Sequence, residues 1–187
     1  MTGSQPRLVT HVDIRPWAEG DLPLLTRLLG DPAMTEHLGG PETPEKLAER
    51  HARYLPGGGR GGGEQFAIVV GPEREAVGWT GYWESEWRAR RVWEIGWSVL
   101  AEHQGRGVAS QAATLLIARL RSVGRHRYIY AFPSVGNAAS NAVCRALGMT
   151  FVGAVDIEYP PGRFMNANEW RLDMREPWPV GEKPISE

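Results

Sequence analysis

The feature that most restricts how this chain can fold is a change of hydrophobic period on either side of Gly105 and Gly107. Residues 91–100 alternate between apolar and other side chains, which is the pattern of a strand. Residues 109–120 instead repeat alanine, leucine and isoleucine at helical spacing. A strand must therefore pass directly into a helix here, and the two glycines permit the tight backbone turn that this requires.

The other segments predict an α+β domain. Strand patterns occupy residues 12–17, 65–70, 76–83, 127–132, 149–157 and 168–174. Helices are predicted at 21–30, 43–54 and 137–147, with Asp21, Thr43 and Asn137 as candidate N-caps. Because most connections are short, neighbouring strands should pair antiparallel. We predict one domain over residues 1–174 with a mixed, mostly antiparallel sheet flanked by helices, and a weakly packed Pro-rich tail at 175–187.

The composition excludes several classes of protein. The 187 residues contain one cysteine, Cys144, so neither an internal disulfide nor a cysteine zinc cluster can form. The histidines are scattered, and we expect no metal site. A net charge of −1 argues against a nucleic-acid partner. Residues 1–10 do not resemble a signal peptide, and no apolar run is long enough to span a membrane, so we expect a cytoplasmic protein without a membrane partner.

The turn at residues 104–110 has the properties of an anion site. Its glycines present successive backbone N–H groups, and the helix that follows adds free N–H groups and the positive end of its dipole. This combination suits a pyrophosphate, although the same turn could simply connect a strand to a helix. A dinucleotide fingerprint does not fit, because the preceding strand belongs to an antiparallel run.

A second glycine-rich stretch, Gly57–Gly63, predicts a flexible loop. A phosphate cradle is the alternative, but the stretch lacks the Gly-Lys-Ser/Thr ending and a following helix. If that alternative held, the chain would be a nucleotide-binding regulator.

Three motifs resemble one known family. The spacing Gln104-x-x-Gly107-x-Ala109 is similar to the acetyl-coenzyme A (acetyl-CoA) signature of the GNAT N-acetyltransferase superfamily. Upstream, Glu94-Ile-Gly-Trp-Ser-Val resembles a strand of the ribosomal-protein N-terminal acetyltransferase branch. Downstream, Asn137-x-x-Ser140 followed by Leu147-Gly-Met is similar to a segment of the same branch. The resemblance covers residues 12–174, nearly the whole chain.

The resemblance implies a GNAT fold whose sheet splays apart at the cosubstrate. Val99 and Leu100 would pair with the pantetheine arm through their main chain, which would satisfy backbone groups left open by the splay. Asn137 would bond the pantetheine, cap its helix, or do both. The pyrophosphate would be held by backbone N–H groups of the signature loop, formed by Gln104, Gly105, Arg106, Gly107, Val108, Ala109 and Ser110.

The implied reaction is transfer of an acetyl group to an amine. Many family members protonate the leaving thiolate with a tyrosine, but Cys144 occupies that place here. The resemblance instead implies Ser140 as the thiolate partner; a helix-start serine that bonds backbone is the alternative. Cys144 is not expected to act as a nucleophile, because a small buried cysteine is common.

Glu94 is the best candidate for the base that takes the amine proton. Small residues on its strand face, Gly96 and Ser98, would leave room for an acceptor. A salt-bridged strand glutamate is the alternative interpretation. Rival bases are Glu84, Glu86, Asp156, Glu158 and Glu169.

Five tryptophans recur between residues 79 and 97. Either they pack the sheet, or some of them wall an acceptor site for an aromatic or cationic group. They are Trp79, Trp83, Trp87, Trp93 and Trp97.

The function that these features imply is N-acetylation of a primary amine, on a protein N-terminus or a small molecule, by direct attack on acetyl-CoA. A non-catalytic acyl-CoA-binding or sensing module of the same fold is the alternative. The family often forms dimers, so a second copy of the chain is a candidate partner.

Overall fold

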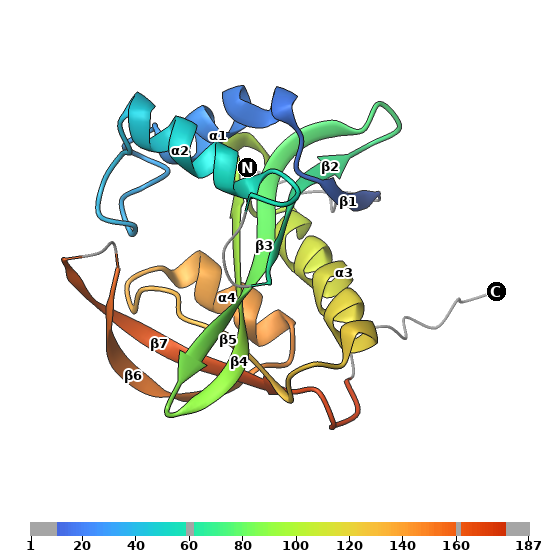
Figure 1. Ribbon diagram of the computed structural model, residues 1–187, viewed down its shortest axis with the longest axis vertical. Helices are drawn as coiled ribbons and strands as arrows, with labels where there is room; N and C mark the ends of the chain where they lie inside the picture. The colour runs from blue at the N-terminus through green and yellow to red at the C-terminus, as the bar shows by residue number, and fades with distance from the viewer. Residues whose placement is uncertain (1–10, 59–61, 160–161, 179–187) are drawn as a thin grey trace, which may run out of the picture.

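A mixed sheet runs through the computed structural model, which describes residues 11–58, 62–159 and 162–178 (Figure 1). Within these residues seven strands pair in the order β1-β2-β3-β4-β5-β7-β6. Only β4 and β5 are parallel; every other neighbouring pair is antiparallel. The strands are β1 (Val12–Pro16), β2 (Glu64–Val70), β3 (Glu75–Trp87), β4 (Arg90–Val99), β5 (Tyr128–Ala131), β6 (Thr150–Glu158) and β7 (Phe164–Asp173). The predicted α+β class and mostly antiparallel sheet are confirmed.

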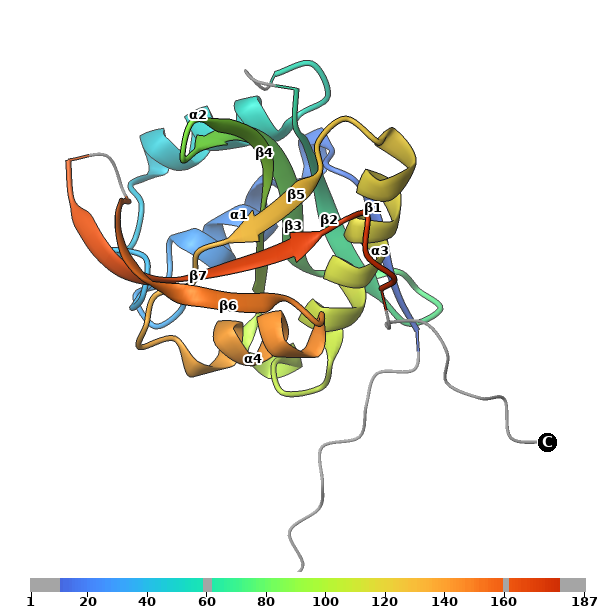
Figure 2. The same cartoon turned by 90° about the horizontal axis from the view of Figure 1, so that it is seen from below.

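Helices cover the two faces of the sheet unequally (Figures 1 and 2). On one face, α3 (Val108–Val123) and α4 (Ala138–Ala146) pack against β4, β5 and β7 around Trp93, Ile129 and Leu147. On the other, α1 (Leu22–Leu29) and α2 (Pro44–Tyr54) cover only part of the sheet, around Trp17 and Ala67. The end of the β3–β4 hairpin reaches over this second face, where Arg88 pairs with Glu169 on β7 and the Trp87 ring contacts Phe132.

The helix starts follow local chemistry, with one difference from the prediction. Thr43 accepts a hydrogen bond from Lys46 N, and Pro44 follows it as the first residue of the helix, so Thr43 caps α2 as expected. Asp21 precedes α1, but its carboxylate does not cap that helix. It accepts hydrogen bonds from Ala18 N and from the Arg15 guanidinium instead, which ties the end of β1 to the start of α1.

Two strands are longer than predicted, because pairing with a neighbour overrides polar composition. β3 continues from Trp83 to Trp87, since its last residues pair with β4 down to Trp87 opposite Arg90. β7 begins at Phe164 rather than 168, because Phe164 pairs with Glu158 on β6.

One residue of the predicted tail packs against the core of the protein. Trp178 Nε1 donates a 2.7 Å hydrogen bond to Leu147 O, and its ring packs on the α3–α4 core. Trp178 therefore packs more firmly than predicted, whereas Glu176 and Pro177 are exposed. The predictions for residues 1–10, for 179–187 and for the centre of the Gly57–Gly63 loop lie outside the described residues. In the part of the chain that is described, no helix has the length and hydrophobicity to cross a membrane.

Candidate active site

The sheet opens between β4 and β5. The two parallel strands pair only at Trp93 with Ile129 and at Glu94 with Tyr130. Beyond Glu94, β4 continues to Val99 along β3, while β5 ends at Ala131 and leads into the loop before α4. The result is a wedge-shaped gap in the sheet with its apex at Glu94 and Tyr130, as the predicted splay requires.

The main chain of β4 supplies polar groups to this gap, but not from all the predicted residues. Leu100 N donates to Val77 O and Leu100 O accepts from His103 N, so the N–H of Leu100 is not available to a ligand. Successive residues of a strand direct their backbone groups to opposite edges. The N–H and C=O groups of Trp97 and Val99 therefore face the gap. Val99 O accepts a 2.8 Å hydrogen bond from Gln104 Nε2. Trp97 was missed in the sequence, because only the pairing of β4 with β3 determines which residues face outward.

The loop between β4 and α3 has the geometry of an anion site. Gly105 (φ 68°) and Gly107 (φ 76°) both adopt the left-handed conformation that favours glycine. Gly107 is the N-cap of α3, and no side chain caps that helix. Its first-turn N–H groups and dipole therefore meet at the open end of the gap, next to the end of β4. This donor set fits a pyrophosphate.

A hollow of about 560 Å³ lies next to this loop, lined by Val70, Gly71, Glu73, Glu75, His103 and Arg106. Its lining carries two carboxylates together with Arg106 and His103, so the charges of this hollow do not select an anion.

The start of α4 brings the predicted Asn137 and Ser140 together. Asn137 Oδ1 accepts a 2.9 Å hydrogen bond from Ser140 N, so the capping role of Asn137 is confirmed. Its Nδ2 group makes no hydrogen bond among the described residues, which leaves a donor for a ligand. The hydroxyl of Ser140, which is half-buried, likewise has no partner within the described residues.

Asn141, which the sequence reasoning missed, fixes this helix start to the sheet. Its Nδ2 donates to Ser134 O (3.0 Å) and Asn137 O (2.8 Å), and its Oδ1 accepts from Asn168 Nδ2 and Trp170 Nε1. Asn141 is 4% exposed. The sequence did contain a signal for this role, namely an asparagine inside a helix directly after a capping motif. Asparagine is unfavourable inside a helix, so its presence there indicates a side chain with hydrogen-bond partners.

Cys144 is fully buried in the core. Burial raises the pKa of its thiol to about 12. The thiol therefore stays protonated at neutral pH, which agrees with the prediction that Cys144 is not a nucleophile.

Glu94 lies at the apex of the gap on the sheet face away from α3 and α4. Trp93 and Ile95 on either side of it are in the α3–α4 core, so Glu94 points to the opposite face. Burial raises the pKa of its carboxyl group, and hydrogen bonds from Ser85 and Trp83 partly oppose that shift. A carboxylate with a raised pKa is better matched to proton transfer near neutral pH.

The rival carboxylates are engaged or point elsewhere. Glu84 lies on the face opposite to Trp83, and its hydrogen bond to His126 (2.8 Å) is the main reason why its pKa is lowered. Glu86 shares that face and is exposed. On the last strands, Asp156 accepts from Asn166, and Glu158 accepts from Gly162 N.

Glu169 is the rival that shares the face of Glu94. It is 1% exposed and pairs with Arg88 at 2.6 Å. It lies on β7 opposite the residue after Ala131, one strand beyond the gap.

The tryptophans divide between packing and the acceptor side. Trp93 and Trp97 pack in the α3–α4 core, and Trp79 stacks on Tyr54 of α2 at 5.3 Å. Trp83 and Trp87 remain on the face of Glu94. The expected room above Gly96 does not exist, because a Cβ there would meet the rings of Trp79 and Trp83 at 3.1 and 3.2 Å. The small residue accommodates tryptophan rather than an acceptor.

Comparison with known proteins identifies the family. Residues 11–150 match the profile of the family described as the acetyltransferase (GNAT) domain, which is more than half of the chain. The chain belongs to the GNAT family of acetyltransferases. No curated protein sequence matches it.

Solved structures share the fold at low sequence identity. A GNAT-family acetyltransferase from Bacillus anthracis superposes with a TM-score of 0.73 at 18% identity, covering 90% of this chain and 98% of that one. A spermidine N-acetyltransferase from Vibrio cholerae, solved with CoA and spermine, gives 0.71 at 16%, covering 88% and 96%. RimL, a ribosomal L7/L12 alpha-N-protein acetyltransferase, gives 0.71 at 22%, covering 90% and 93%. The GNAT fold is therefore confirmed.

Proposed function

We propose that this chain transfers the acetyl group of acetyl-CoA to a primary amine that attacks the thioester carbonyl directly. The observation that carries the proposal is the gap between β4 and β5, with the uncapped start of α3 at its open end and Glu94 at its apex. A pantetheine arm in the gap would place the thioester near Glu94. Relatives that act on spermidine and on a ribosomal protein support an amine as the acceptor.

The residues of the gap have separate roles in this reaction. Glu94 takes a proton from the attacking amine, directly or through one water, because only the neutral amine is a nucleophile. The N–H of Trp97 is directed into the gap and would stabilise the oxyanion. Ser140 donates a hydrogen bond to the leaving thiolate, and Asn137 Nδ2 holds the pantetheine. These assignments make Glu94 and Ser140 the catalytic residues.

The remaining cosubstrate contacts come from the loop before α3. Backbone N–H groups from Gln104 to Ser110 hold the pyrophosphate, as the left-handed glycines allow. Gln104 acts indirectly, since its side chain is bonded to Val99 O. Metal plays no part in this proposal, and the cytoplasmic location and the dimer remain predictions from sequence.

Release of free thiol from acetyl-CoA, measured over a panel of primary amines together with the mass of the acetylated product, tests this function. We expect thiol and acetylated amine in equal amounts for at least one amine. A chain that acetyl-CoA stabilises against heat, but that releases no thiol with any amine, would instead be a non-catalytic acyl-CoA-binding module.

A further inference from the structure

Glu169 on β7 is a buried carboxylate whose partner is exposed. The Glu169 side chain is 2% exposed, whereas that of Arg88, its partner at 2.6 Å, is 63% exposed. A carboxylate this deeply buried needs a positive partner, because an unpaired buried charge is costly. An exposed arginine stabilises such an ion pair only weakly, because its side chain loses conformational entropy when it is held against the carboxylate.

Arg88 lies in a turn whose backbone conformation is strained. Trp87 pairs with Arg90, so Arg88 and Ala89 form the two-residue turn of the β3–β4 hairpin. Both have positive φ, 52° and 58°. Asparagine and glycine are the residues that suit such a turn, and other side chains are strained there. In addition, Trp87 Nε1 is buried without a partner among the described residues.

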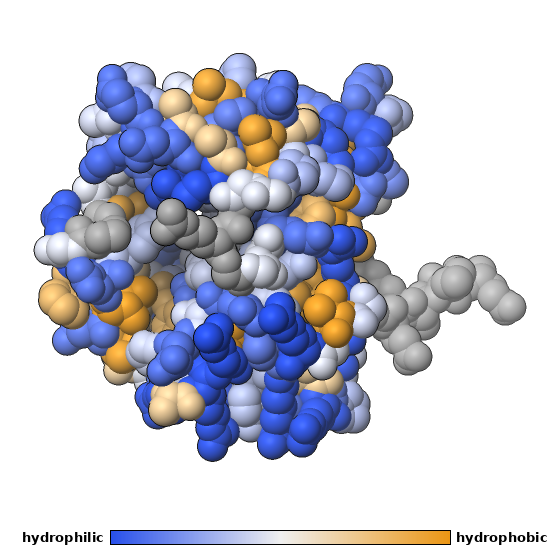
Figure 3. Space-filling model, in the orientation of Figure 1, coloured by the Kyte–Doolittle hydropathy of each residue, from blue (hydrophilic) through white to orange (hydrophobic). Residues whose placement is uncertain are grey.

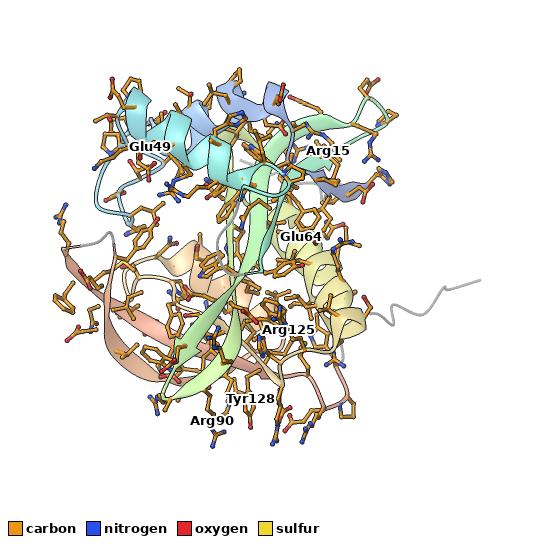
Figure 4. All side chains as sticks on the ribbon, viewed as in Figure 1. Arg15, Glu49, Glu64, Arg90, Arg125 and Tyr128 are labelled. Atoms are coloured by element: carbon orange, nitrogen blue, oxygen red, sulfur yellow. The ribbon has the colours of Figure 1, made fainter. Side chains whose placement is uncertain are left out.

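Two features of the hairpin end are therefore unfavourable: the positive φ angles of its turn and the buried, unpaired Trp87 Nε1. The Arg88–Glu169 contact helps to hold the hairpin end over the sheet despite them. At the lower edge of the molecule in Figure 3, where this hairpin end projects, hydrophilic atoms lie beside a pale orange patch. Figure 4 shows Arg90, at the same hairpin end, pointing away from the protein. Arg88 differs from Arg90 in reaching back to a buried carboxylate.

Aromatic rings lie beside Glu169, and Arg171 on the same face is directed to the Tyr128 ring, 5.2 Å from its centroid. Phe132 follows Ala131, which pairs with Trp170, so Phe132 lies beside Glu169 on this face. Phe132 stacks with Tyr130 at 5.9 Å, and the Trp87 ring meets it edge-on at 4.8 Å. Aromatic rings next to a carboxylate bind an ammonium group as well as a guanidinium.

Glu169 and Glu94 lie on one face of the sheet. Glu94 pairs with Tyr130, Tyr130 pairs with Arg171, and Glu169 is two residues before Arg171. Standard strand spacings place the two Cα atoms about 12 Å apart. An acceptor whose reacting amine lies at Glu94 can therefore reach Glu169 with a second group.

We propose that Glu169 binds a second cationic group of the acceptor, and that Arg88 occupies this position until the acceptor displaces it. This deepens the proposed acetyltransferase function and rests on it. The acceptor class is then a linear amine with two or more positive centres, rather than a simple monoamine.

A matched pair of amines tests the proposal: an α,ω-diamine with eight carbons and the eight-carbon monoamine, both assayed by thiol release. We expect the wild-type chain to have a kcat/KM at least tenfold higher for the diamine. Glu169→Gln keeps the shape and still accepts from Arg88, but removes the charge. It should raise KM for the diamine at least tenfold and change KM for the monoamine less than twofold.

Substitution of the competing arginine should act in the opposite direction. Arg88→Ala removes the group that the diamine must displace, so KM for the diamine should fall about threefold while KM for the monoamine stays unchanged. Arg90→Ala, an exposed arginine on the same hairpin, is the control and should alter neither value. A merely structural ion pair would instead move both amines alike in Glu169→Gln and in Arg88→Ala.

Each other outcome has a separate meaning. Equal wild-type kcat/KM for the two amines, or an equal change of both in Glu169→Gln, would overturn the subsite and leave the acetyltransferase function intact. No thiol release with any amine would overturn the acetyltransferase function itself. If Glu169→Gln shows no cooperative melting, the comparison of Arg88→Ala with Arg90→Ala takes its place as the test. An unchanged KM for the diamine in Arg88→Ala would then reject the proposal.

Discussion

Trp170 Nε1 donates a buried hydrogen bond of 2.9 Å to Asn141 Oδ1, and this bond joins β7 to α4 inside the protein. The same asparagine holds Asn168 on β7 and two carbonyl groups before α4, Ser134 O and Asn137 O. One amide therefore sets where the start of α4 lies relative to the sheet. Since α4 begins with Asn137 and Ser140, this contact positions the predicted pantetheine and thiolate partners.

Replacement of this amide should lower stability substantially. Asn141→Leu leaves the Trp170 indole N–H buried without an acceptor, and we expect the free energy of unfolding to fall by about 2–4 kcal/mol. Denaturant titration followed by tryptophan fluorescence measures this change. Ala142→Leu, at the next and exposed position of α4, is the control and should stay within about 0.5 kcal/mol of wild type. Equal stabilities of the two variants would show that the Asn141 network contributes little.

Gly107 should be required for cosubstrate binding. Its φ of 76° is strained for a β-branched residue, and a side chain would stand where the pyrophosphate is expected. Gly107→Val should therefore abolish the rise in melting temperature that acetyl-CoA produces in the wild type. Gly124→Ala is a matched control, because Gly124 is also left-handed (φ 64°) but ends α3. It should lower the melting temperature and retain the shift; full protection of Gly107→Val would refute the loop assignment.

Glu94→Gln should reduce catalysis in a way that pH partly reverses. Loss of a general base typically costs 10² to 10⁴ in rate, and we expect kcat/KM to fall by about that range. The loss should shrink at high pH, where the amine is already neutral. Glu84→Gln, on the opposite face, should keep wild-type rates. Wild-type rates for Glu94→Gln between pH 6 and 9 would remove Glu94 from the mechanism.

The raised pKa of Glu94 also predicts how stability depends on pH. The folded chain holds the Glu94 proton more tightly than the unfolded chain, whose value is about 4.5. The stability from this group is therefore complete below the unfolded pKa and is lost as pH rises through the folded pKa. Glu94→Gln lacks this loss, so its melting temperature should rise relative to wild type between pH 4 and pH 8. Parallel curves for the two proteins would contradict a raised pKa.

Ser140→Ala should separate catalysis from helix capping. The backbone N–H that Asn137 caps is kept in this variant, so folding and the KM for acetyl-CoA should change little. If the hydroxyl assists the thiolate, kcat should fall about tenfold or more. Steady-state kinetics measure both constants. Ser122→Ala, on the exposed end of α3, is the control; an unchanged kcat in Ser140→Ala would leave Ser140 as a helix-start residue.

Much of the fold and part of the site could be predicted from local sequence. The alternation of residues 91–100, the glycines at 105 and 107 and the helical repeat after them specify a strand, a tight turn and a helix without help from the rest of the chain. The signature loop and the cap at Asn137 were found for the same reason, since each depends on residues that are close in sequence. The alternation also placed Glu94 on the face opposite to Trp93.

Contacts between distant segments could not be read in the same way. Only the pairing of β4 with β3 decides that the backbone N–H of Trp97 faces the gap and that the N–H of Leu100 does not. The space above Gly96 is filled by Trp79 and Trp83, because the rings of one strand lie over the next. The partners of Asn141 and Glu169 come from residues up to 81 positions away.

The sequence by itself determined the order of elements, the glycine turn before α3 and the family to which the chain belongs, because backbone preference and hydrophobic period act over a few neighbouring residues. Tertiary structure alone decided where the sheet opens, which carboxylates share its open face and which charge is buried. Those properties depend on strand register and burial, and both arise only when segments far apart in the chain pack together.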